Sequence, residues 1–232
     1  MDDGSPTVWE RAEPPPRTAP TPLSRAAIVA AAIALADDGG LDAVSLRKVG
    51  AALSAGPMRL YGFVDSKDEL LDLMADAVQG EIGVPAGEWR VALTALAEAT
   101  RAAVLRHEWF ADLMGGRPRL GPNRLAVLEG SLAAVLPAFP AVDDARHVLW
   151  TVHAYVAGAV RAEVGERRAA RRTGVDKPAW QAAHGAYLRR TLATGRFPMI
   201  ERFVAEGTDG DPAAVFAAGL AAVLDGLAAQ RR

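Results

Sequence analysis

The chain has 232 residues, a formal net charge of −2, 50% hydrophobic residues, few aromatics and no cysteine. This composition favours closely packed helices, so we expect an all-α protein with one large core or two smaller ones. The lack of cysteine excludes a disulfide framework and thiolate metal sites. No run of 18 uncharged apolar residues occurs and the first residues are acidic, so we expect a cytoplasmic protein without a membrane span.

Residues 1–22 are predicted to form a disordered or polyproline arm. They contain six of the fifteen prolines, including the run Pro14-Pro15-Pro16, and such segments bury too little apolar surface to fold alone. Two arginines against four acids give the arm a charge of −2 (2 − 4), which disfavours binding in a DNA minor groove. Trp9 is the side chain best suited to anchor the arm to the rest of the protein.

A first helix is predicted from residue 24 to about residue 38. Ser24 is a good N-cap, apolar residues recur on one face, and Gly39-Gly40 is a typical C-terminal stop.

Two short helices joined by a turn are predicted at residues 45–53 and 57–63. Ser45 is an N-cap for the first, and Leu46, Val49 and Leu53 give it one buried face. The sequence Ser-Ala-Gly at 54–56 suits the turn. Pro57 suits the first position of the second helix, because it has the right φ and lacks an N–H that would be left unpaired. This pattern is typical of a helix-turn-helix DNA reader.

The basic charge of this region is local. Residues 45–64 carry three basic side chains and no acid, or +3, whereas residues 23–80 as a whole carry five basic and eight acidic residues, or −3 (5 − 8). Charges further apart than about 10 Å are largely screened at moderate salt, so a small basic face is enough to attract phosphates. With so small a face, we expect two copies of the reader to act together in a dimer.

A fourth helix is predicted at 67–82, opened by the capping box Ser66 to Glu69. The composition break at 83–87 predicts a domain boundary, which gives an arm at 1–22, a DNA-binding domain at 23–83 and a helical body at 84–232. Helices of the body are predicted near 88–107, 109–115, 121–137, 141–165, 178–194, 198–206 and 212–230, with breaks at glycine and proline. Residues 166–177 have five basic residues, two acids and no apolar period, so we expect a solvated loop there.

The order of these elements resembles the TetR (tetracycline repressor) family of bacterial transcriptional regulators. The resemblance rests on the bridge at 39–45, on Arg47, on the Leu60-Tyr61 pair and on the spacing of residues 64–71. The body resembles the tetracycline-repressor-like C-terminal subclass in its length and in two elements, His107-Glu108-Trp109 and Gly121-Pro122-Asn123.

The resemblance implies roles for six residues of the reader. Arg47 matches a position that can read a guanine edge, and Pro57, Met58 and Arg59 lie at the start of the recognition helix, where base contacts concentrate. Tyr61 and Lys67 match positions that contact phosphates. Two alternatives stay open from the residues alone: Arg47 pairs with Asp42 or Asp65, or Tyr61 is a half-buried core residue.

Two positions depart from the family pattern. Many relatives have a bulky or basic residue where this chain has Gly62, and a histidine where it has Phe63. Gly62 offers no side chain to DNA and weakens a helix, and Phe63 suits the core.

For the body, the resemblance implies dimerisation and the binding of a small effector that shifts the population of DNA-competent states. A histidine beside aromatic residues on a helix is more often a core residue than a ligand contact. No magnesium ligands are assigned, and we expect no cofactor. The candidate effector-binding residues, with Tyr155 and Trp180 as further aromatic candidates, are His107, Trp109, Phe110, Trp150, His153 and Tyr187.

Helices 141–165 and 212–230 are rich in alanine and glycine, which suits a four-helix dimer interface, although packing within one chain would use the same residues. The chain has no Gly-rich phosphate loop, no G-x-S-x-G elbow and no His-Glu-x-x-His sequence, so we expect no enzyme. The sequence therefore predicts a homodimeric repressor that an effector releases from a near-palindromic operator. The alternative is a helical small-molecule-binding or protein-interaction scaffold without DNA binding, which the acid-free run at 45–64 disfavours.

Overall fold

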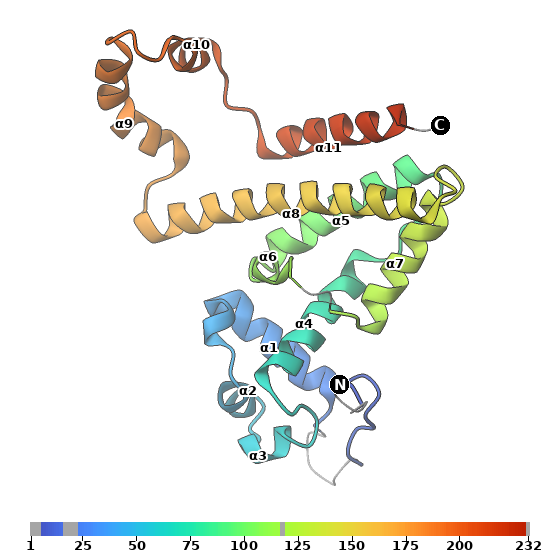
Figure 1. Ribbon diagram of the computed structural model, residues 1–232. Coiled ribbons are helices and arrows are strands. Elements are labelled where there is room, and N and C mark those ends of the chain that lie inside the picture. The colour runs from blue at the N-terminus through green and yellow to red at the C-terminus, as the bar shows by residue number, and fades with distance from the viewer. Residues whose placement is uncertain (1–5, 16–22, 117–118, 231–232) are drawn as a thin grey trace.

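A computed structural model describes residues 6–15, 23–116 and 119–230 (Figure 1). All regular secondary structure in these ranges is helical, which confirms the predicted all-α class. The elements of the N-terminal part are α1 (Arg25–Gly39), the 3-10 helix η1 (Leu41–Ala43), α2 (Leu46–Ala52), α3 (Pro57–Leu60) and α4 (Lys67–Ile82). Those of the body are α5 (Trp89–Arg106), α6 (Phe110–Leu113), α7 (Pro122–Val135), α8 (Val142–Thr173), α9 (Lys177–Leu192), α10 (Pro198–Glu206) and α11 (Pro212–Ala229).

The helix starts of the N-terminal part follow the predicted local chemistry. The hydroxyl oxygens of Ser24 and Ser45 accept backbone N–H groups of the first turns of α1 and α2, at 3.2 and 3.3 Å. Ser66 does the same for Glu69 at 3.1 Å. The capping box is only half formed, because the Glu69 carboxylate accepts the N–H of Asp65 rather than that of Ser66.

The helix α3, the expected recognition helix, is shorter than predicted, since it ends at Leu60 and residues 61–63 form a turn. Gly62 therefore lies in this turn and does not weaken the helix. Leu60 and Phe63 are buried, with Leu60 fully inside the core that α1 and α2 also contribute to. Although α3 is short, its buried apolar side chain holds it against the core.

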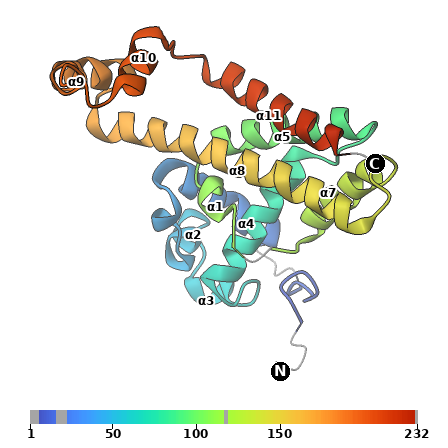
Figure 2. The same ribbon diagram turned by 45° about the horizontal axis from the view of Figure 1, so that its top comes forward.

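In the body, α8 is the central element. It packs against α5 and α11, and both views show it running the length of the body with α11 beside it (Figures 1 and 2). The buried stripe of α11 follows the predicted helical period, with Phe216, Leu220, Leu224 and Leu227 all inside the core. The helices α2 and α3 lie at the end of the molecule opposite α11.

The solvated loop predicted at 166–177 is wrong for residues 166–173, where α8 continues to Thr173. Its last turns are held by ion pairs instead of apolar contacts. Arg168 donates to both carboxylate oxygens of Asp112 at 2.9 Å, and Arg171 donates to Glu108. The hydrogen bond from Arg171 is the main reason why the pKa of Glu108 is lowered. The helix stops at Gly174, whose φ of +70° is left-handed.

The N-terminal arm differs from the disordered segment expected from its composition. In the described residues 6–15, Val8 is 2% exposed and Arg11 forms ion pairs with the start of α4. The other expected arm residues, 1–5 and 16–22, lie outside the described ranges. Trp9, the expected anchor, is half-buried, but Arg11 makes the ion pairs.

Candidate DNA-binding surface and effector site

The six residues predicted to contact DNA are all exposed and come from neighbouring elements. Arg47 lies on α2, three of the others form the first turn of α3, and Tyr61 and Lys67 lie in the turn after α3 and at the start of α4. Met58 is 81% exposed, and an apolar side chain left so open to water suits contact with a partner. Tyr61 is 48% exposed and does not belong to the core cluster or to the residues packed against it.

The guanidinium groups of Arg47 and Arg59 belong to exposed residues, accessible to phosphates or bases. Within the described ranges, neither Arg47 nor Arg59 forms an ion pair, so the alternative that Arg47 pairs with Asp42 or Asp65 is not seen. Lys67 donates to the carbonyl oxygen of Leu41 at 3.1 Å and remains exposed. Exposed cationic donors thus come from three neighbouring elements, with Arg47 on α2, Arg59 on α3 and Lys67 on α4, as suits a helix-turn-helix that docks on DNA.

The effector candidates do not come together in one pocket. His107, Trp109 and Phe110 are buried where the body meets the N-terminal domain. The Nδ1 atom of His107 lies 2.8 Å from a carboxylate oxygen of Asp37, to which the indole N–H of Trp109 also donates at 2.7 Å. The Nε2 atom of His107 lies 3.3 Å from Glu81 of α4. These side chains tie α1 and α4 to the body.

The remaining candidates lie on α8 and α9. Trp150 of α8 is 75% exposed and Tyr187 of α9 is 63% exposed. Tyr155 donates its hydroxyl to the carbonyl oxygen of Phe216 at 2.7 Å and so joins α8 to α11. Trp180 packs against His184, with ring centroids 4.2 Å apart, on exposed α9.

His153 of α8 has a positive environment. The side chain is exposed in the single chain, and partial desolvation lowers its pKa most, followed by the charges of Arg124 on α7 and Arg161 on α8. Two nearby guanidinium groups oppose a divalent cation, so His153 does not fit a magnesium ligand. Among the described residues, no group of three or more acidic or histidine side chains could hold a metal ion.

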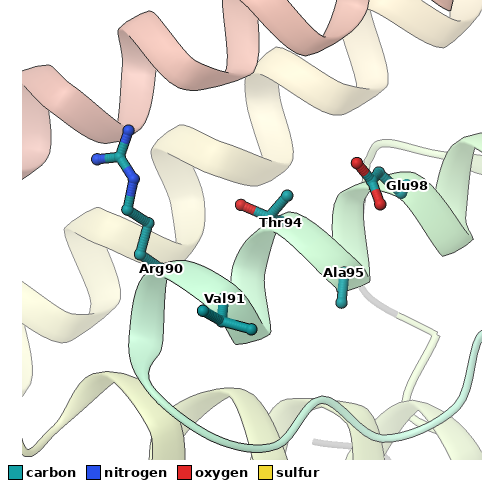
Figure 3. A pocket seen from close by; sticks show the side chains of 5 residues that line it. All are labelled: Arg90, Val91, Thr94, Ala95 and Glu98. Atoms are coloured by element: carbon teal, nitrogen blue, oxygen red, sulfur yellow. The ribbon is translucent and has the colours of Figure 1, made fainter.

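A hollow that the sequence analysis did not predict lies along one face of α5 (Figure 3). Its volume is about 350 Å³, and it is wide open to solvent. Arg90, Thr94 and Glu98 recur every four residues along its wall, a polar period that could have pointed to an exposed face. The full lining is Arg90, Val91, Thr94, Ala95 and Glu98.

Comparison with known proteins identifies the family of this chain. Residues 84–231 match the model of the tetracyclin repressor-like C-terminal domain. The chain is 36% identical over 232 residues to the HTH-type transcriptional repressor DrrR1 of Streptomyces coeruleorubidus, covering 97% of this chain and 86% of that protein. It is 30% identical over 217 residues to the class A tetracycline repressor from transposon 1721 of Escherichia coli, covering 91% and 93% of the two chains.

Solved structures agree with these sequence matches. The TetR family protein ActR of Streptomyces coelicolor, in complex with actinorhodin, superposes with a TM-score of 0.79 and 26% identity, covering 91% of this chain and 98% of that one. These relatives are transcriptional regulators and not enzymes, and the scaffold alternative without DNA binding is not favoured. The chain belongs to the TetR family and is a helix-turn-helix DNA-binding transcriptional repressor.

Proposed function

We propose that the protein binds a near-palindromic operator as a homodimer and that a small organic effector releases it. In this proposal residues 23–83 read DNA, residues 84–232 dimerise and bind the effector, and the protein acts in the cytoplasm. The exposed basic surface of α2 and α3 supports the first part. Arg47, the first turn of α3, Tyr61 and Lys67 are the proposed contacts.

The observation that carries the dimer is the outer face of α11. This helix has a mean hydropathy of 1.7, and only 22% of it is buried inside one chain. By length and composition it could cross a membrane, but in a DNA-binding repressor such a face suits a partner subunit, because small residues let helices approach closely. Its exposed alanine and valine residues are Ala213, Ala214, Val215, Ala217, Ala218, Ala221, Ala222 and Ala229.

Light scattering tests the dimer. At micromolar concentration we expect a mass of twice 24.4 kDa. Ala218→Glu places a charge in the proposed interface and is expected to give a monomer with weaker operator binding. Ala126→Glu, on the exposed side of α7, is the matched control and leaves the mass unchanged. A wild-type mass of a single chain would exclude the homodimer.

A gel shift with the promoter region of the protein's own gene tests the DNA surface. Replacing Arg59 with Ala is expected to cost about 1–3 kcal/mol and to relax sequence preference if Arg59 contacts a base, and Lys67→Ala to weaken binding evenly across sequences. Arg202→Ala removes the same charge from exposed α10 and serves as the control. Unchanged affinity in the double variant of Arg59 and Lys67 would rule out this surface.

The effector is proposed to be a small organic molecule. ActR, whose structure with actinorhodin superposes on this chain, binds such a molecule. A thermal-shift screen of aromatic natural products, followed by release of the protein from its promoter fragment, tests the proposal. Hits that raise the melting temperature without releasing DNA would contradict the release step.

A further inference from the structure

Residues 7–15, here called the strap, fold against the reader. The strap begins with a turn in which Glu10 and Arg11 donate their N–H groups to the carbonyl oxygen of Thr7, at 3.0 and 3.2 Å. The Glu10 carboxylate in return accepts the N–H and the hydroxyl of Thr7, at 2.8 and 2.9 Å. Val8 is buried. The strap therefore has a defined conformation before it reaches the prolines.

Arg11 fastens the strap to the start of α4. Its guanidinium group donates to Asp65 and, at 2.5 Å, to Glu69. Burial alone would raise the pKa of Glu69, but the hydrogen bonds from Arg11 and from the Asp65 N–H outweigh it and lower that pKa. The carboxylates of Asp65 and Glu69 therefore share one guanidinium group.

Arg25, the first residue of α1, links the strap to the turn after α3. Its guanidinium group donates to the carbonyl oxygen of Arg11 at 2.8 Å and to that of Phe63 at 3.1 Å. Its backbone N–H donates to Glu13 at 3.2 Å. One side chain therefore holds two backbone segments that are far apart in sequence.

Pro14 lies over Gly62, in the same turn. A Cβ atom placed on Gly62 would lie 3.3 Å from the Cγ atom of Pro14, so the missing side chain makes room for the proline ring. Next to this contact is a hollow of about 330 Å³ between the strap and α3, lined by Pro14, Pro15, Leu23, Met58, Arg59, Gly62 and Phe63. The strap thus runs beside the recognition helix without covering Met58 or Arg59, both of which stay exposed.

The ion pairs of Arg11 with Asp65 and Glu69 bear on DNA binding, because these two acids lie next to a proposed phosphate contact. Asp65 and Glu69 flank Lys67, a proposed phosphate contact, and Asp65 is 64% exposed. Unpaired, they would put two negative charges next to the DNA backbone, within the screening length of about 10 Å. With Arg11 in place the three groups sum to −1 instead of −2.

We propose that the strap is a working part of the DNA reader, in which Arg11 masks Asp65 and Glu69 from the phosphates and Pro14 on Gly62 holds the strap beside α3. This inference rests on the proposed DNA surface. Arg11 acts as a positioning and charge-masking residue, with no phosphate or base contact of its own. The proposal also gives a role to Gly62, which departs from the family pattern: the missing side chain leaves room for Pro14.

Fluorescence anisotropy with two labelled duplexes, the promoter fragment and an unrelated sequence of the same length, tests the proposal. Arg11→Ala is expected to weaken binding to both duplexes by about three- to tenfold, since unmasked acids repel every phosphate backbone alike. Removing the acids as well, in Arg11→Ala with Asp65→Asn and Glu69→Gln, is expected to restore affinity to within about twofold of the wild type. Arg202→Ala controls for the loss of one positive charge, and a thermal melt of each variant confirms that it is folded.

The outcomes separate the strap from the DNA surface itself. If Arg59→Ala weakens binding while Arg11→Ala does not, the surface stands and the strap proposal fails. If the triple variant stays as weak as Arg11→Ala, Arg11 contacts DNA directly and masking is wrong. If neither Arg59→Ala nor Arg11→Ala changes affinity, the proposed DNA surface fails as well.

Discussion

Tyr155 of α8 leaves no room for a side chain at position 219 of α11. A Cβ atom on Gly219 would lie 2.3 Å from the Tyr155 hydroxyl oxygen, which donates to the carbonyl oxygen of Phe216 one turn earlier. The close approach of α8 and α11 therefore depends on a glycine. Because α11 also carries the proposed dimer face, this contact fixes the position of that face relative to α8.

Gly219→Ala is expected to lower the free energy of unfolding by about 1–3 kcal/mol, as is usual when a packed site is overfilled. Urea unfolding followed by circular dichroism measures it. Gly226→Ala on the same helix is the matched control, since a Cβ atom there meets nothing within 4 Å. That change is expected to stabilise by about 0.5–1 kcal/mol through helix propensity. Equal effects of the two changes would contradict the close contact.

Asp76 of α4 caps the start of α7 across the structure. Its buried carboxylate accepts the backbone N–H groups of Asn123 at 3.2 Å and Arg124 at 2.9 Å. Asp76→Ala leaves both donors without this partner, so we expect a loss of about 1–2 kcal/mol in thermal or urea unfolding. Asp225→Ala, which removes an exposed ion pair with Arg90, should change stability by less than about 1 kcal/mol. Similar losses in both variants would argue against the cap.

His107 is expected to be a structural contact between the body and the reader. His107→Ala removes one partner of Asp37 and one of Glu81 and leaves a cavity where a buried side chain stood, so we expect a loss of about 2–3 kcal/mol in urea unfolding. His184→Ala on exposed α9 is the control and should have little effect. A His107→Ala protein of wild-type stability that no longer responds to an effector would instead return His107 to the ligand site.

His153 predicts a pH dependence of stability. The side chain is exposed in the single chain, but partial desolvation and the charges of Arg124 and Arg161 lower its pKa in the folded protein, so the unfolded chain, with a pKa of about 6.5, takes up the proton more readily. The neutral form is favoured by folding, and its contribution is complete above pH of about 6.5 and is lost as the pH falls through the folded pKa. Compared with His153→Gln, the wild type should lose stability more steeply between about pH 7 and pH 5. Parallel curves for the two proteins in urea unfolding would refute this.

The sequence predicted a structural feature correctly where the interaction that stabilises it joins residues close together in the chain. Ser24, Ser45 and Ser66 cap their helices through bonds that span three residues, and the predicted starts of those helices are correct to within about one residue. The end of α8 was missed because its support comes from Glu108, which is 63 residues away from Arg171. A charged helix surface has no apolar period to reveal it.

The candidate sites show the same division. The six predicted DNA-binding residues are all exposed. The motif that predicted them lies within one short stretch of the sequence. By contrast, His107 meets Asp37 across 70 residues and Arg11 meets Asp65 across 54. Only the packing of α1, α4 and the body brings such partners together. No single segment of the sequence therefore has a pattern that predicts these contacts.

The contacts along α4 have a mechanical consequence. This helix has 16 residues and is therefore about 24 Å long, and it is tied to the body by Asp72 with Arg119, by Asp76 with α7 and by Glu81 with Arg106. A tilt of about 5° at the body end moves the reader end by about 2 Å over that length. In the proposed homodimer, each reader would have to meet base edges at hydrogen-bond distances of about 3 Å, and the two readers would have to match half-sites about 34 Å apart. A lever of this length would turn a shift smaller than one bond length at α7 into a loss of register on the proposed operator.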